Sequence, residues 1–196
     1  MANKRGLRVA VVCASNMNRS MAIHNVLLDI PNLHVRSYGI ANKICIPGDQ
    51  PHTSNIYDFG VTYDEIFKEL KQKNERVYTQ IGLLQMLHRN RQLKPKPERF
   101  QDAREKFDVI VTCERKVFDR LVDFMEHKTP EEFTICHVIN VDIQDSLEEA
   151  NNKAYFVRDL CKSLSSSQDL DYEIKHILKA FKDSHGLPYN HKIVFN

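Results

Sequence analysis

The stretch from Leu7 to Leu27 constrains the fold of this chain more than any other, because an apolar strand pattern, a polar loop and a helical pattern follow one another directly. The strand pattern is short and rich in β-branched residues, with Leu7, Val9, Val11 and Val12. The helical pattern begins with Met21, Ala22, Val26 and Leu27. The loop between them is CASNMNRS, from Cys13 to Ser20. A buried strand that turns straight into a helix is typical of α/β folds, so we expect Cys13 at a strand-to-helix turn.

This loop has the composition of an anion-binding site. Unpaired amides of a loop and of the first helical turn attract negative charge, and we expect such a phosphate-binding nest from Ala14, Ser15, Asn16, Met17, Asn18, Arg19 and Ser20. The same field favours a thiolate over a thiol. Arg19 can direct two N–H groups at phosphoryl oxygens, and the Ser20 hydroxyl can hydrogen-bond the thiolate. The Cys-x5-Arg spacing therefore predicts a covalent phosphatase site with Cys13 as the nucleophile.

A second interpretation of the same residues is a buried, inert cysteine beside a solvated arginine. The strand, the Cys-x5-Arg-Ser spacing and the helix occur together, and this combination favours chemistry. The small polar residues Ser15, Asn16 and Asn18 fit as well, because such side chains tolerate the left-handed or bridge conformations that an anion-binding loop needs.

A phosphatase of this kind also needs a general acid that protonates the leaving oxygen. The sequence VDIQDS, after an apolar strand pattern, offers Asp142 and Asp145. Asp142 continues the strand pattern and can simply brace the loop. Asp145 lies in the turn before the next predicted helix, and this position favours it as the acid.

Composition is consistent with a single domain over residues 1–196, in which 42% of residues are hydrophobic. Twenty-eight basic residues nearly balance 26 acidic ones, so direct nucleic-acid binding has little electrostatic support. The five cysteines are scattered and show no CxxC spacing, which predicts a reducing compartment. The nine histidines form no ligand-spaced cluster with them, so we expect no metal and no other cofactor. No segment has the length of an apolar membrane span, and we expect no membrane partner.

Strand and helix patterns alternate along the rest of the chain. Further strands are predicted at Leu33–Tyr38, Phe107–Thr112 and Phe133–Val141. Helices are predicted as a pair over 62–91, around 117–125, from Ser146 to Leu164 with a capping-box spacing to Glu149, and over 170–183. This order predicts a doubly wound parallel sheet of about four strands, with an edge segment at Lys192–Phe195 and the helical pair inserted near the active site.

The chain resembles the Ssu-type phosphatases of the RNA polymerase II carboxy-terminal domain, a branch of the low-molecular-weight phosphotyrosine phosphatase fold. The resemblance covers nearly the whole chain and is carried by VAVVCASNMNRSMAIHN, PNLHVRSYG, YDFGVTYDEIF, YTQIGLLQML, RNRQLKPKPERFQ, FDVIVTCERKVFD and NVDIQD. In this resemblance Cys13, Arg19 and Asp145 match the family's nucleophile, phosphate-binding arginine and general acid. The helical pair over 62–91 matches a helical insertion of the family.

The resemblance implies a function as well as a fold. It implies dephosphorylation of the fifth-position serine of the polymerase heptad repeats, or of the seventh, with the following proline in cis. It also implies a nuclear role in transcription and mRNA 3′-end processing, with symplekin as a partner. A cis proline demands a site open to a tight turn, and we expect Met17, Pro47 and Met86 to line that groove. Packing in the core is the alternative interpretation of these three side chains.

Some positions depart from the family pattern: Ala22, Ile23, Ile81 and the pair Arg115 and Lys116. Because the catalytic loop is intact, these departures indicate a divergent paralogue with altered substrate tuning or partner affinity. Two other functions share the loop. A low-molecular-weight-type phosphotyrosine phosphatase would have a deeper pocket with aromatic walls, and a silenced phosphopeptide-binding scaffold would not depend on the Cys13 thiol. An arsenate reductase is disfavoured, because the other cysteines show no relay spacing.

Overall fold

The computed structural model describes residues 5–130 and 133–196. The domain expected over residues 1–196 includes two short segments, 1–4 and 131–132, that lie outside this range. Fourteen elements follow one another within it. In chain order they are β1 (Leu7–Cys13), α1 (Arg19–Leu27), β2 (Leu33–Gly39), β3 (Ile44–Pro47), β4 (Ser54–Tyr57), α2 (Tyr63–Gln80), α3 (Leu83–Leu93), a 3-10 turn (Phe100–Asp102), β5 (Val109–Thr112), α4 (Arg115–His127), β6 (Ile135–Val141), α5 (Leu147–Ser166), α6 (Leu170–His185) and β7 (Tyr189–Phe195).

The central sheet has the strand order β2-β1-β5-β6-β7. The first four strands run parallel, and β7 pairs antiparallel with β6 along the edge. The predicted parallel sheet with an added edge strand is therefore confirmed, although the edge strand begins at Tyr189 rather than Lys192. The strand predicted from Phe133 begins at Ile135, and the one predicted from Phe107 begins at Val109.

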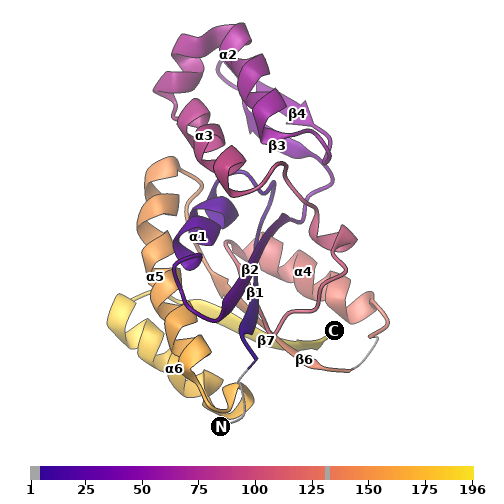
Figure 1. Cartoon of the computed structure of the whole chain (residues 1–196), viewed down its shortest axis with the longest axis vertical. Coiled ribbons are helices and arrows are strands. Elements are labelled where there is room, and N and C mark those ends of the chain that lie inside the picture. Colours follow the sequence, from indigo (N-terminus) through magenta and orange to yellow (C-terminus); the bar gives the residue numbers. More distant parts are fainter. Residues whose placement is uncertain (1–4, 131–132) are drawn as a thin grey trace.

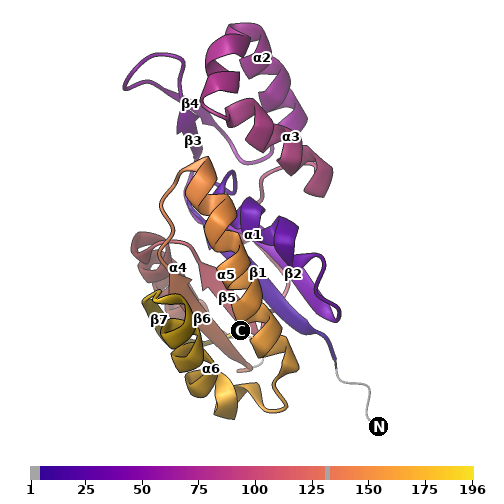
Figure 2. The same cartoon turned by 90° about the vertical axis from the view of Figure 1, so that its left-hand side faces the viewer.

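Helices cover both faces of this sheet. The odd-numbered residues of β1 pack with α1, α5 and α6, which lie over one face in Figure 2. The even-numbered residues Ala10 and Val12 pack with α4 on the other face. Because side chains alternate along a strand, a strand covered on both faces is apolar throughout, and this is the pattern of β1.

A separate lobe sits at the carboxyl end of β1 and is formed by β3, β4, α2 and α3 (Figure 1). The helical pair expected over 62–91 is present and extends to Leu93. The antiparallel hairpin of β3 and β4 is not predicted from the sequence, because each strand is only four residues long and the pattern ICIP ends in a proline. The apolar core of this lobe includes Met17 and Met21, so the lobe packs directly on the loop after β1.

The predicted start of α5 is confirmed, with the Ser146 half of the capping box present. Ser146 is the N-cap, and its hydroxyl accepts a hydrogen bond from the amide of Glu149 at 3.2 Å. This cap satisfies one of the free amides at the start of the helix and fixes where the preceding loop, which contains Asp145, ends.

Candidate active site

The loop from Cys13 to Ser20 lies where the strand order of the sheet reverses. Cys13 ends β1, which has β2 on one side and β5 on the other. In α/β sheets of this kind, ligands bind beyond the carboxyl ends of the strands at such a switch point. The loop continues into α1, whose first residue is Arg19. The topology therefore places the cysteine and the arginine at the position where an open sheet binds its ligand.

Cys13 has a hydroxyl beside its sulfur. The distance from Cys13 Sγ to Ser20 Oγ is 3.1 Å, and both residues are buried. Asn16 Nδ2 donates to Ser20 Oγ at 3.0 Å, while Asn16 Oδ1 accepts from the amide of Glu98 at 3.0 Å. Because the backbone amide of Glu98 can only donate, Asn16 must present its NH₂ group to Ser20. The Ser20 O–H is then free to donate to a thiolate at Cys13.

Asn16 has a left-handed backbone conformation with φ of 55° and is completely buried. Asparagine adopts this conformation more readily than most residues, as expected for the loop. The neighbouring strand β2 also comes close to the loop, and this contact depends on a glycine. A Cβ atom on Gly39 would lie 2.8 Å from the carbonyl oxygen of Ala14 and 3.0 Å from the amide nitrogen of Asn16. Glycine at position 39 lets β2 pack against the loop.

Both terminal nitrogens of Arg19 pair with a carboxylate. Its Nη1 donates to Glu114 Oε2 at 2.7 Å and to the carbonyl oxygen of Ile143 at 3.2 Å. Its Nη2 lies 3.1 Å from Asp145 Oδ2, and its Nε is buried with no hydrogen-bond partner among the described residues. A buried N–H without an acceptor is costly. The Nε and Nη2 atoms lie on one edge of the guanidinium, which is the edge that a phosphoryl group can bind in a bidentate manner.

The charges around Arg19 reinforce its positive state. Burial by itself lowers the pKa of Arg19, but an ionised Cys13 and the carboxylates of Asp145 and Glu114 outweigh burial and raise that pKa above the ordinary arginine value. Burial, together with the charge of Cys13, also raises the pKa of Cys113 well above the usual value for a thiol. Cys113 lies beside Cys13, since its amide donates to the Val12 carbonyl at 3.2 Å. The site therefore contains one arginine that stays charged and one neighbouring thiol that stays neutral at physiological pH.

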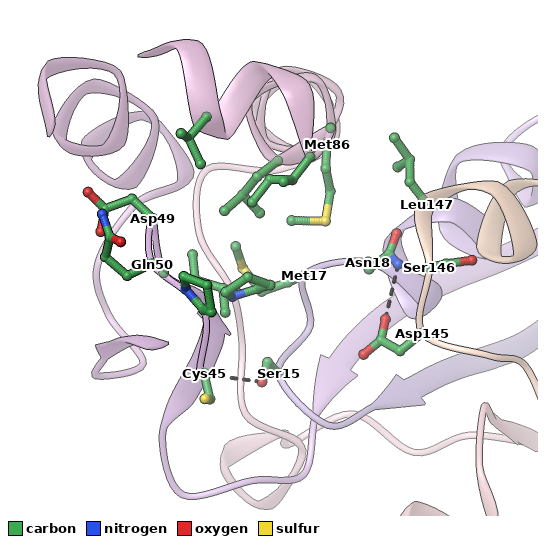
Figure 3. A pocket seen from close by; sticks show the side chains of 18 of the residues that line it. Ser15, Met17, Asn18, Cys45, Asp49, Gln50, Met86, Asp145, Ser146 and Leu147 are labelled. Carbon is green, nitrogen blue, oxygen red and sulfur yellow. Dashed lines mark hydrogen bonds between the residues drawn. The ribbon is translucent and has the colours of Figure 1, made fainter. Parts of the chain in front are cut away.

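The two candidate acids have different environments. Asp145 Oδ1 accepts from Asn18 Nδ2 at 3.0 Å (Figure 3), and Asp145 Oδ2 pairs with Arg19. Asp142 instead accepts a hydrogen bond from Asn140 Nδ2 at 3.0 Å. The side chain of Asp145 is 56% exposed, so it can turn toward a bound molecule. The structure thus brings Asp145, and not Asp142, to the arginine and the loop.

An elongated groove of about 550 Å³ opens beside Cys13 and ends at the tip of the hairpin loop. Met17, Pro47 and Met86 all line it, and Met17 and Met86 are at the same time buried in the apolar core of the lobe, so both interpretations of these two side chains remain open. Figure 3 shows Asp145 and Ser146 at one end, with Asp49 and Gln50 at the other. Within the described part of the chain, no aromatic side chain lines the groove. The hairpin and the two inserted helices form the far wall of the groove, which is mostly apolar. Its volume gives space for an extended or turned peptide.

Within the described residues, no group of three or more His, Cys, Asp or Glu side chains is placed to hold a metal ion. No helix in the same part of the chain is long and apolar enough to cross a bilayer.

In the described part of the chain, four residues whose side chains hydrogen-bond to the loop are not identified from the sequence: Glu114, Tyr63, Arg89 and Asn90. Glu114 holds Arg19, and the other three donate hydrogen bonds to loop carbonyls. Glu114 lies two residues after β5, the strand that neighbours β1, and this is the signal by which sequence reasoning could have found it. The other three lie on amphipathic helices, where nothing in the local pattern distinguishes them from surface or core residues.

Comparisons with known proteins agree on one family. A family model described as "Ssu72-like protein" matches residues 7–196. The RNA polymerase II C-terminal domain phosphatase SSU72 of Xenopus laevis is 43% identical over 189 residues, which cover 96% of this chain and 97% of that protein. A human relative, the C-terminal domain phosphatase SSU72 like protein 4, is 40% identical with the same coverage. A structure of Drosophila melanogaster Ssu72 with symplekin, bound to a cis peptidomimetic CTD phosphoserine peptide, is similar at a TM-score of 0.93 and 39% identity, over 98% of this chain and all of that chain.

Proposed function

Because this chain belongs to the Ssu72-like protein family, we propose that it removes phosphate from serine in the C-terminal domain of RNA polymerase II, through a cysteinyl-phosphate intermediate. One observation carries the proposal. Cys13 lines a largely apolar groove of about 550 Å³, and its sulfur lies 3.1 Å from the Ser20 hydroxyl. The relatives at 40–43% identity over nearly their full length carry the name of this activity.

In the first chemical step, the Cys13 thiolate attacks the phosphorus in line with the serine oxygen. The bond from sulfur to phosphorus forms while the bond from phosphorus to the serine oxygen breaks. Arg19, through Nε and Nη2, and the loop amides bind the three equatorial oxygens, whose charge spreads in the transition state. Glu114 keeps the opposite side of the guanidinium in place.

Asp145 transfers its proton to the departing serine oxygen. In this structure its carboxyl group pairs with Arg19 Nη2, and the phosphoryl group takes over this edge of the guanidinium when substrate binds. Asn18 Nδ2 then remains as the hydrogen-bond partner that orients the carboxyl group. The immediate products are the free serine side chain and a phosphorylated Cys13.

In the second step, Asp145 accepts a proton from a water molecule that attacks the phosphorus. The bond from phosphorus to sulfur breaks, inorganic phosphate leaves, and Cys13 returns as a thiolate. The Ser20 hydroxyl, which is already oriented by Asn16, donates to the departing sulfur and lowers the cost of its negative charge.

The groove supports a phosphoserine followed by a cis proline as the substrate. A cis bond before proline folds the peptide back on itself, and such a turn needs a wide apolar wall rather than a narrow slot. Met17, Pro47 and Met86 supply such a wall beside Cys13. A phosphotyrosine pocket of the related enzymes would have aromatic walls, and the lining of this groove has none among the described residues. The phosphotyrosine alternative is therefore less well supported than phosphoserine.

The same proposal places the protein in the nucleus, where the polymerase tail is phosphorylated and nascent mRNA is processed at its 3′ end. The fly relative is solved as a complex with symplekin. We infer that this chain also binds symplekin and works with the mRNA 3′-end processing machinery. Neither nucleic acid nor a membrane is needed for this role.

Turnover of singly phosphorylated heptad peptides tests the proposal. The native protein should release phosphate from a peptide phosphorylated at the fifth-position serine, in the presence of EDTA and with inhibition by vanadate, while Cys13→Ser should be inactive. The same measurement with a symplekin fragment tests the partner. A protein with no vanadate-sensitive, metal-independent activity on any heptad peptide would contradict the proposal, and preference for a phosphotyrosine peptide would favour the alternative.

A charged residue in the groove separates peptide recognition from chemistry. Met86→Lys should lower kcat/KM for the heptad phosphopeptide and leave turnover of p-nitrophenyl phosphate nearly unchanged, because the small substrate does not reach the far wall. Equal losses on both substrates would remove Met86 from the groove and place it in the packing of the loop.

A further inference from the structure

Side chains of the inserted helices donate hydrogen bonds to backbone carbonyls of the phosphate loop. From α2, the Tyr63 hydroxyl donates to the carbonyl oxygen of Asn16 at 2.6 Å. From α3, Asn90 Nδ2 donates to the carbonyl oxygen of Met17 at 2.6 Å. Arg89 Nη2 donates to the carbonyl oxygens of Met17 at 3.4 Å and Asn18 at 3.2 Å. Three successive loop carbonyls therefore have donors from the insertion.

These contacts also determine where the loop amides point. In a planar trans peptide unit, the carbonyl of one residue and the N–H of the next point in opposite directions. None of the described peptide bonds is cis. Holding the carbonyls of residues 16–18 toward the insertion therefore turns the N–H groups of residues 17–19 the other way. That direction is the one an anion-binding nest requires.

The first part of the loop is held by the central sheet instead. The carbonyl oxygen of Cys13 accepts from the amide of Ile40, and that of Ala14 accepts from the amides of Ile40 and Ala41, each at 3.0 Å. These donors are backbone groups at the end of β2. The second half of the loop, which leads into Arg19, depends on side chains from a segment more than 40 residues further along the chain.

Arg89 carries a positive charge, and its hydrogen bonds within residues 5–130 and 133–196 go to no carboxylate. Its other hydrogen bonds go to the side-chain oxygens of Asn90 and Asn151, and among the described residues it makes no ion pair. Burial lowers the pKa of Arg89 to about 10, which still leaves it charged at neutral pH. Two groups near it would attract its charge if they were ionised, Tyr63 and Cys13. Tyr63 is fully buried and keeps its proton, since burial raises its pKa well above the ordinary value. Among the residues that the structure describes, the thiolate of Cys13 is thus the anion left to balance Arg89.

We propose that Arg89 is a positioning residue of the phosphate site, which orients the loop amides through the carbonyls of Met17 and Asn18 and supplies a second, half-buried positive charge for the Cys13 thiolate. The proposal rests on the phosphatase function proposed above and deepens it. If the proposal is right, the inserted helices form a wall of the peptide groove and also contribute a positive charge that stabilises the Cys13 thiolate. Arg89 touches neither the phosphate nor the reacting atoms, and its effect reaches them through the loop and through its charge.

The test compares Arg89→Gln with Arg91→Gln. Arg91 lies on the same helix but pairs with Asp64 and stacks over the Phe67 ring, away from the loop. Arg89→Gln should lose about tenfold in kcat/KM on both a heptad phosphopeptide and p-nitrophenyl phosphate, and about tenfold in vanadate affinity, as for the loss of one charge-assisted contact. Arg91→Gln should match the native protein in each measurement.

A second readout distinguishes charge from packing. The rate of Cys13 alkylation by iodoacetamide follows the thiolate, so the pH of its half-maximal rate should rise by about half a pH unit in Arg89→Gln. Arg89→Lys should keep that midpoint, because it keeps the charge, yet lose part of the vanadate affinity, because lysine cannot donate to two carbonyls from one planar group.

An Arg89→Gln protein with native vanadate affinity and a native alkylation midpoint would overturn the proposal. If Arg89→Gln does not fold, Arg89→Lys decides: native vanadate affinity refutes the positioning role, and at least a threefold loss supports it. Vanadate binding and alkylation need no peptide substrate. They therefore test Arg89 even if the native protein fails to turn over the heptad peptide, which would count against the proposed function alone.

Discussion

Replacing Glu114 with glutamine tests whether the position of Arg19 depends on a carboxylate outside the loop. Glu114 Oε2 accepts from Arg19 Nη1 at 2.7 Å, and the Arg19 side chain is only 4% exposed. Glutamine has nearly the same shape and keeps one oxygen acceptor, so Glu114→Gln removes the charge and leaves the hydrogen bond. We expect a folded protein in which Arg19 is held less firmly.

The magnitude follows from the type of contact that changes. Arg19 keeps its charge, so its hydrogen bond to the glutamine oxygen remains charge-assisted. The substitution removes only the attraction between two opposite charges, which contributes about 0.2–1 kcal/mol in an exposed pair and more in a buried one. The Glu114 side chain is 35% exposed, which moderates this attraction, so we expect a loss near 1 kcal/mol, or about fivefold in kcat/KM. Glu114→Ala also removes the acceptor, so its loss should reach about 30-fold or more.

A double-mutant cycle with Arg19→Ala shows whether Glu114 acts through the arginine. Hydrolysis of p-nitrophenyl phosphate is the assay, because this substrate reports on the phosphate site without the peptide groove. In the Arg19→Ala background, Glu114→Gln should have almost no further effect. Losses that simply add in the double variant would refute the reasoning and assign Glu114 a separate role.

Three further predictions concern the acid, the loop and a buried histidine. Asp145→Asn should lower kcat for a phosphoserine peptide by about 10²-fold or more but affect p-nitrophenyl phosphate much less, because an aryl leaving group needs little protonation; equal losses would contradict the role of acid. Gly39→Ala should lower the melting temperature and the vanadate affinity together, since its Cβ would lie 2.8 Å from a loop carbonyl oxygen; a variant with native values for both would show that the loop tolerates the methyl group. Burial, with the charges of Lys94 and Arg36, lowers the pKa of His24 to about 4, so the unfolded chain gains a proton near pH 6.5 that the folded protein does not bind until about pH 4. The free energy of unfolding should therefore fall by up to about 3 kcal/mol as pH drops through this window. His24→Gln should flatten this part of the pH profile of urea unfolding; an unchanged slope in the variant would assign the effect to other groups.

The parallel sheet was predictable because its central strands β1 and β5 are buried on both faces and therefore apolar along most of their length, as in VAVV and VIVT. The hairpin of β3 and β4 was not predictable for the opposite reason. Its strands are four residues long and alternate only briefly, since one face of this small sheet stays exposed, with Ile56 at 65%. Short, half-exposed strands leave little periodicity to read.

The placement of Cys13 and Arg19 around one loop was determined by the sequence itself, because the loop is local. Eight consecutive residues between a strand and a helix leave few backbone paths, and a small polar composition selects the anion-binding one. Asp145 was also within reach of sequence reasoning, since it precedes a helix whose cap is readable at Ser146.

Only the tertiary structure decided what surrounds that loop. Glu114 reaches Arg19 because β5 lies beside β1, and Tyr63 and Arg89 reach the loop carbonyls because the inserted helices pack on Met17. Each of these contacts joins residues 40 or more positions apart, and each depends on the rotation of a helix or the register of a strand. A local pattern shows which face of a helix is apolar, but it does not show which polar residue at the edge of that face will meet a carbonyl of another segment.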